Sequence, residues 1–240
     1  QHNMLEQIKI LSSRRAYEFH QDNLRLSILS TKPVQEQLQE LFRFQTSAMG
    51  SPLPTFGDVP VTYPPGIVFD MGVWISPKEQ LVPIRFLHFE QRRIVIDVAG
   101  PSSAITAIFD RVREFFSDLH APDGSPVVGE PERILDYSEI TVQYPFSLDV
   151  MIAEPFRKIL NTTLSENTDT GNLMIPTFSV RFYPADQELA SAPSVNDFRA
   201  LTLALREGTK PQEHVYFSSA PLDSETHLRY LHELETTFKL

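Results

Sequence analysis

The chain has 240 residues, with 21 Lys or Arg against 31 Asp or Glu, so its formal net charge at pH 7 is −10. This acidic balance argues against a broad electrostatic grip on nucleic acid or on an anionic membrane. Cysteine is absent, which excludes disulfides, thiolate metal ligands and a cysteine nucleophile and favours a reducing compartment. The start lacks an apolar signal core, and no run of about 18 apolar residues occurs. We therefore expect a soluble, cytoplasmic protein.

The first part of the chain predicts a hairpin followed by a helix. Residues 5–20 and 23–29 have the composition of strands and are separated by a polar turn. Thr31 can then cap a helix whose first turn contains Pro33 and whose apolar stripe includes Leu38.

Residues 48–65 contain five prolines and two glycines, so we expect an extended surface loop rather than a helix. Two interpretations of this loop remain open. It is either a proline-stiffened connector or a binding segment, because long loops without secondary structure are often functional. If it binds a partner, the candidate contact residues are Pro54, Phe56 and Tyr63 in the loop, together with Trp74 in the segment that follows.

The segment 66–76 alternates as a strand should. Trp74, the single tryptophan, either packs in the core or lines a recognition surface, and packing is the favoured interpretation for a large aromatic side chain. The predicted faces are Ile67, Phe69, Met71, Val73 and Ile75 on one side, and Val68, Asp70, Gly72 and Trp74 on the other.

Residues 81–99 predict a hairpin that turns at Gln91 and Arg92 and leads into a helix over 102–119. In this register Glu90 lies opposite Arg93. The core face is predicted to carry Leu87, Phe89, Ile94, Ile96 and Val98. The other face is predicted to carry Ile84, Phe86, Val95, His88, Glu90, Arg93 and Asp97.

The second half predicts further strands and helices. A strand over 139–146 is followed by a helix from Pro155, with Phe156, Ile159 and Leu160 expected to point inward. Strands are also predicted at 172–184 and 214–221. The segment 194–208 predicts a helix with Leu201 and Leu205 on its apolar stripe, and a last helix is predicted from Asp223 or Ser224 to Phe238.

These elements define an α+β fold, with mainly antiparallel sheet and four or five helices packed on it. The turn-rich connector after the first long helix suggests two halves, 1–121 and 122–240, although one continuous domain is the alternative. Both halves end with a strand, a short proline junction and a helix, so we also consider a duplication of two strand-strand-helix halves.

The sharpest chemical cluster consists of His88, Glu90 and Asp97, because a histidine held by a carboxylate is the minimal general base. The competing interpretation is a solvated sheet face, and no nucleophile elbow accompanies the cluster. Glycine-rich phosphate loops are also absent, so we predict no cofactor and no metal ion. His227 and His232 lie five residues apart on the last helix and are predicted to be surface residues.

Two functions of different classes therefore remain open. The favoured one is a protein without catalytic activity that binds another protein as an adaptor, inhibitor or complex subunit. The alternative is a metal-assisted hydrolase that uses His88, Glu90 and Asp97. Nucleic-acid binding through Arg85, Arg92 and Arg93 is disfavoured by the net charge.

Overall fold

A computed structural model describes residues 8–20, 23–49, 66–167, 176–181 and 200–238. Its strands are β1 (Ile8–Glu18), β2 (Thr46–Met49), β3 (Gly66–Ile75), β4 (Leu81–Glu90), β5 (Arg93–Val98), β6 (Arg133–Gln143), β7 (Thr177–Arg181), β8 (Ala200–Leu205) and β9 (Val215–Ala220). Its helices are α1 (Leu26–Leu29), α2 (Lys32–Leu41), α3 (Ser102–Phe116), α4 (Glu154–Asn167) and α5 (Ser224–Phe238), with 3₁₀ turns η2 (Leu148–Met151) and η3 (Pro211–Glu213).

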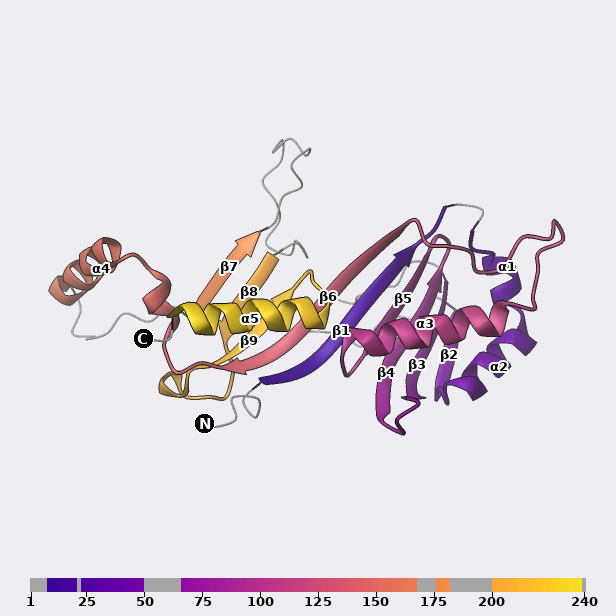
Figure 1. Cartoon of the computed structure of the whole chain (residues 1–240), viewed down its shortest axis with the longest axis horizontal. Coiled ribbons are helices and arrows are strands. Elements are labelled where there is room, and N and C mark those ends of the chain that lie inside the picture. The colour runs from indigo at the N-terminus through magenta and orange to yellow at the C-terminus, as the bar shows by residue number, and fades with distance from the viewer. Residues whose placement is uncertain (1–7, 21–22, 50–65, 168–175, 182–199, 239–240) are drawn as a thin grey trace. The chain divides into compact units, whose positions relative to one another are not determined.

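The described residues thus form nine strands and five α-helices, which is the α+β fold that the sequence predicts (Figure 1). The strand order is β2-β3-β4-β5-β1-β6-β9-β8-β7. Neighbouring strands pair in an antiparallel way from β2 to β1 and again from β6 to β7. Among the helices that the structure describes, none combines the length and the apolar character that a bilayer crossing requires.

The chain divides into two compact units. The N-terminal unit is Ser12–Tyr137, and the C-terminal unit consists of Gln1–Leu11 together with Ser138–Leu240. Strands β1 and β6 each contribute residues to both units. The division of the sequence into halves 1–121 and 122–240 stays a prediction.

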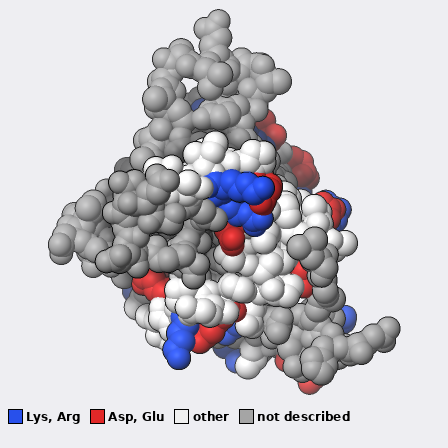
Figure 2. All heavy atoms as spheres, turned by 90° about the vertical axis from the view of Figure 1, so that its left-hand side faces the viewer, with Lys and Arg blue, Asp and Glu red and all other residues white. Residues whose placement is uncertain are grey.

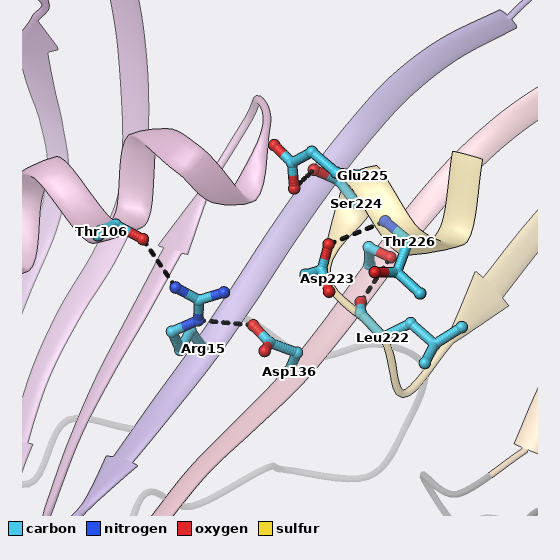
Figure 3. Close-up of polar contacts among 9 residues, drawn as sticks. Arg15, Thr106, Asp136, Leu222, Asp223, Ser224, Glu225 and Thr226 are labelled. Atoms are coloured by element: carbon cyan, nitrogen blue, oxygen red, sulfur yellow. Dashed lines mark hydrogen bonds and ion pairs between the residues drawn. The ribbon is translucent and has the colours of Figure 1, made fainter. Parts of the chain in front are cut away.

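The core of the N-terminal unit lies between its helices and one face of the strands β3, β4, β5 and β1. Tyr17 of β1 stacks on Phe109 of α3 with ring centroids 3.7 Å apart. At the solvent edge of this layer, Arg15 of β1 donates to Asp136 at 2.6 Å and to Thr106 of α3 at 2.8 Å (Figure 3). Apolar and aromatic packing therefore holds α3 on the sheet, with a polar clamp at its margin.

The register of the β4–β5 hairpin is confirmed, but the predicted faces of β3 and β4 are wrong at their outer ends. Met71 has a positive φ of 54°, which interrupts the alternation of β3, and its side chain is exposed. Beyond it Gly72 faces Phe44, and Trp74 packs against the core instead of lying on the face of Asp70. On β4 a shift in the pairing with β5 likewise turns Ile84 into the core.

The predicted strand over 23–29 is also wrong. Part of this segment forms the short helix α1, which leads through Ser30 and Thr31 into α2 and buries Leu29 in the core. The helix predicted at Thr31 and Pro33 is confirmed as α2. Tertiary packing of Leu29 therefore decides the local structure against its strand-like composition.

The core of the C-terminal unit lies between α5 and one face of the strands β6, β9 and β8. Asp223 begins the last helix as predicted, because its carboxylate accepts the backbone N–H of Thr226 at 2.8 Å (Figure 3). The predicted helix over 194–208 is wrong where it is described, since Leu201 and Leu205 belong to strand β8 between β7 and β9. Residues 194–199 of that prediction lie outside the described residues.

Candidate functional site

His88 and Glu90 lie on one face of β4, at the end of the strand that leads into the β4–β5 turn. Nδ1 of His88 is 3.2 Å from Oε1 of Glu90, and Arg93 donates to Oε2 of Glu90 at 2.8 Å. Burial acts to raise the pKa of Glu90, but the contact with His88 and the hydrogen bond from Arg93 outweigh it and lower this pKa. Glu90 is therefore an ionised carboxylate at neutral pH, held from two sides.

Asp97 belongs to a separate ion-pair group. Arg14 donates from Nε and Nη2 to its Oδ2 at 2.8 and 2.7 Å, and Nε of Arg85 lies 3.9 Å from its Oδ1. The guanidinium of Arg14 also lies 5.3 Å from the ring centre of Phe86. The three predicted site residues therefore share one sheet face, but Glu90 pairs with His88 and with Arg93, whereas Asp97 pairs with Arg14 and Arg85. In the part of the chain that the structure describes, no group of three or more acidic, histidine or cysteine side chains could hold a metal ion.

A pocket of about 1150 Å³ opens beside Glu90 in the N-terminal unit. Its charged lining consists of Glu18, Glu90, Glu132, Arg92, Arg93 and Arg133. Four of the lining residues form two pairs across adjacent strands, since Glu18 pairs with Arg93 between β1 and β5, and Glu90 pairs with Gly66 between β4 and β3.

Gly66 is required by this arrangement. A Cβ added there would collide with the backbone carbonyl of Phe89 and would approach Nε2 of His88 to 2.9 Å. The glycine therefore lets β3 run close to β4 directly at the His88–Glu90 pair. His88 itself is fully buried, so its contact with Glu90 positions that carboxylate, while Glu90 is the member of the pair that reaches the pocket.

A second exposed feature lies in the C-terminal unit, on α4. The prediction that its apolar residues point inward is wrong for two of them, since Phe156 is 55% and Ile159 is 61% exposed. Leu160, one residue further on, is half-buried. Figure 2 shows the side of the molecule on which α4 is drawn in Figure 1, where uncharged side chains surround small charged groups of both signs. The helix itself is confirmed, and its apolar face is open to solvent.

Of the residues predicted for partner binding, only Trp74 can be placed. It packs against the core of the N-terminal unit, with its ring centre 6.2 Å from that of Phe42. This is the packing role that the sequence favours for it. Pro54, Phe56 and Tyr63 lie outside the described residues, so their role stays a prediction.

A buried polar network surrounds His227 in the C-terminal unit, although the sequence predicts His227 to be a surface residue. His227 is fully buried between two serine hydroxyls, with Nδ1 2.9 Å from Oγ of Ser138 and Nε2 2.8 Å from Oγ of Ser218. The hydroxyl of Ser138 donates to the carbonyl of Leu222 at 2.8 Å. Ser138 therefore accepts from Nδ1–H, and Ser218 donates to Nε2, which defines the neutral tautomer of the ring. His232 is half-buried.

No protein-family model matches this chain, and no curated protein sequence matches it either. The class that the geometry defines is an antiparallel α+β protein that has, among its described residues, a charged pocket beside Glu90 and an exposed apolar helix face on α4.

Proposed function

We propose that this protein acts without catalysis, by binding another protein, and that the apolar face of α4 is the contact surface. The observation that carries the proposal is the exposure of Phe156 and Ile159, which lie three residues apart and therefore on one side of the helix. An amphipathic helix that lays such anchors into a groove of its partner is a recurring mode of protein recognition.

The charged side of α4 supports this choice of surface. Glu154 pairs with Arg157 one turn away, and Nζ of Lys158 lies 3.9 Å from the same carboxylate. These charges are satisfied within the helix itself, so they do not demand a partner. The apolar side is what remains available for contact, and burying it gives a favourable free energy because apolar surface leaves water.

The size of the effect can be estimated. Full burial of one Phe or Ile side chain contributes about 1.5–3 kcal/mol. Phe156 and Ile159 already bury a little under half of their surface, so we expect about 2 kcal/mol from covering the pair, which corresponds to roughly 30-fold in Kd. A contact of this size produces a measurable loss when both side chains are truncated.

The test compares wild-type protein with the double variant Phe156→Ala, Ile159→Ala and with Lys158→Ala, a control on a different side of the same helix. Each is immobilised and exposed to native extract, and bound proteins are quantified by mass spectrometry. We expect at least one protein that is retained in stoichiometric amount by wild type and by Lys158→Ala and is lost by the double variant. Its absence, or light scattering that shows only self-association through this face, would overturn the proposal.

A second candidate function, metal-assisted hydrolysis, is favoured by the 3.2 Å contact between His88 and Glu90. It predicts stoichiometric metal in protein purified without chelator, and loss of that metal in His88→Ala but not in His232→Ala. Elemental analysis of the three proteins checks this expectation. Wild-type protein that contains no stoichiometric metal would exclude this candidate and leave the binding proposal unaffected.

A further inference from the structure

We infer that the charged pocket of the N-terminal unit is a binding site for a peptide segment that carries both acidic and basic side chains. This site is separate from α4, lies on residues of the N-terminal unit alone, and does not depend on the function proposed for that helix.

The lining of the pocket includes a charged side chain, Glu90, that is itself buried. Glu90 is only 8% exposed, yet it lines the pocket and is held from two sides by His88 and Arg93. Keeping an ionised carboxylate at this depth costs desolvation energy, which the two partners offset. A charge kept in a buried position at the base of an open cavity is typical of a binding site.

The rim is fixed by the backbone and, at Arg92, also by a side-chain hydrogen bond, because Nε of Arg92 donates to the carbonyl of Phe19 at 3.4 Å. The N–H of Glu132 donates to the carbonyl of Glu18 at 2.7 Å, and the N–H of Phe19 donates to the carbonyl of Arg92 at 2.8 Å. Among the ion pairs of the described residues, none involves Glu18, Glu132, Arg92 or Arg133. Two guanidinium groups and two carboxylates therefore face a shared cavity on a preorganised frame.

The balance of charge selects the ligand. Three arginines and three glutamates line the pocket, so its lining carries no net charge, within a protein of net charge −10. A polyphosphate would bring several negative charges to the three glutamates, and a polyamine would bring its positive charges to the three arginines. A ligand with both signs can pair its carboxylate with a guanidinium and its cation with a glutamate.

The size of the pocket favours a peptide over a single amino acid. Its volume of about 1150 Å³ lies slightly above the range of roughly 300–1,000 Å³ that is usual for drug-sized ligands. An extended segment of about six residues spans roughly 20 Å and points successive side chains to opposite sides. Such a segment can present acidic and basic groups to different parts of the rim.

The test uses three fluorescently labelled peptides of about six residues, capped at both ends: an alternating Glu-Lys peptide, an all-Glu peptide and an all-Lys peptide. Fluorescence anisotropy at low ionic strength measures their affinity for the full chain. We expect the alternating peptide to bind at least about tenfold more tightly than either peptide of one sign. Equal binding of the three peptides, or no binding of the alternating one, would overturn the inference.

Two pairs of neutralising variants then assign the binding to the pocket. Arg92→Gln with Arg133→Gln should weaken the alternating peptide about tenfold and shift the preference toward all-Lys. Glu18→Gln with Glu132→Gln should shift the preference toward all-Glu. Opposite shifts in peptide preference report on charge recognition, because a loss of folding would not produce them.

Matched controls make the same changes of charge elsewhere on the N-terminal unit. Lys32→Gln with Lys78→Gln, and Glu36→Gln with Glu79→Gln, alter exposed side chains and should leave all three affinities within about twofold. If they change binding as much as the pocket variants do, the site is not this pocket. The α4 double variant should bind the alternating peptide like wild type, so failure here and failure of the α4 proposal give different results.

Discussion

The two units place a helix on an antiparallel sheet with different chemistry underneath. In the N-terminal unit α3 is held by apolar and aromatic side chains, including the stacked pair Tyr17 and Phe109. In the C-terminal unit α5 is held in part by His227, which is hydrogen-bonded between Ser138 and Ser218. The difference shows that one architecture can include a buried hydrogen-bonded network among the apolar contacts that hold its helix.

Two polar residues of the C-terminal unit, His227 and Ser218, stand at positions where the N-terminal unit has isoleucines. Helices α3 and α5 both begin on a buried serine, and three residues further on lie Ile105 and His227. On the strands beneath, Ile96 lies two residues before Val98, which pairs with the buried Ser13. In the same way Ser218 lies two residues before Ala220, which pairs with the buried Ser138. This correspondence supports our proposal that the two halves arose by duplication and that their cores diverged in polarity.

The largest effect is expected in the N-terminal unit, where apolar and aromatic packing holds α3 on the sheet. Phe109→Ala should lower the free energy of unfolding by about 3–5 kcal/mol, because it leaves a cavity against Tyr17. Urea denaturation followed by tyrosine and tryptophan fluorescence measures this loss. Glu114→Ala, an exposed change on the same helix, should stay within about 0.5 kcal/mol. A similar loss in both variants would contradict a packed α3 interface.

The second effect depends on pH and should come from the C-terminal unit. Burial lowers the pKa of His227 from 6.5 to about 4. Between these two pH values the imidazole is therefore protonated in the unfolded chain but neutral in the folded protein. Stability is therefore complete above about pH 6.5 and is lost as the pH falls toward 4, by at most about 3 kcal/mol. Urea unfolding across this range should show a steeper decline in wild type than in His227→Leu. Parallel curves would contradict a buried neutral imidazole.

A smaller effect tests the completeness of the hydrogen bonds. Ser218→Ala removes the donor to Nε2 of His227 and should cost about 1–3 kcal/mol, because a buried acceptor is left unsatisfied. The double variant Ser218→Val, His227→Leu imitates the apolar N-terminal unit and should lie within about 1 kcal/mol of wild type, since Ser138 still donates to Leu222. If the double variant loses as much free energy of unfolding as its two single changes together, the comparison between the two units fails.

The smallest effect concerns the start of the helix. Asp223→Ala removes the acceptor for the N–H of Thr226 and should cost about 1 kcal/mol. Asp223→Asn keeps an acceptor and should recover most of the loss. Thermal unfolding by circular dichroism distinguishes these variants, and equal midpoints for all three proteins would show that the cap contributes nothing.

Local patterns were sufficient for much of the fold. The β4–β5 hairpin was predicted in its observed register because Gln91 and Arg92 interrupt two dense apolar runs. Strand β9 and helix α5 followed from the alternation of one and the cap of the other. The prediction failed at Met71, since a single residue with positive φ shifts every later side chain, and no residue type in that strand announces it.

The site was predicted less completely because its geometry is set by partners distant in sequence. The alternation along β4 correctly placed His88 beside Glu90, but the capture of Asp97 by Arg14 depends on the pairing of β5 with β1. His227 was missed because an isolated histidine among polar residues has no apolar pattern, and its two serines lie on different strands. The alternation within β6 and β9 that turns these serines toward α5 was the available signal.

The close approach of β3 to β4 at Gly66 predicts which residues related sequences should share. Because every side chain at position 66 would strike the carbonyl of Phe89, we expect glycine at this position wherever the His88–Glu90 pair is kept. A glycine that opens one strand, with His-x-Glu at the end of the strand paired to it, is therefore a signature that distant relatives should retain after the surrounding apolar residues have exchanged. Those three positions give a way to recognise kin of this protein in newly determined sequences.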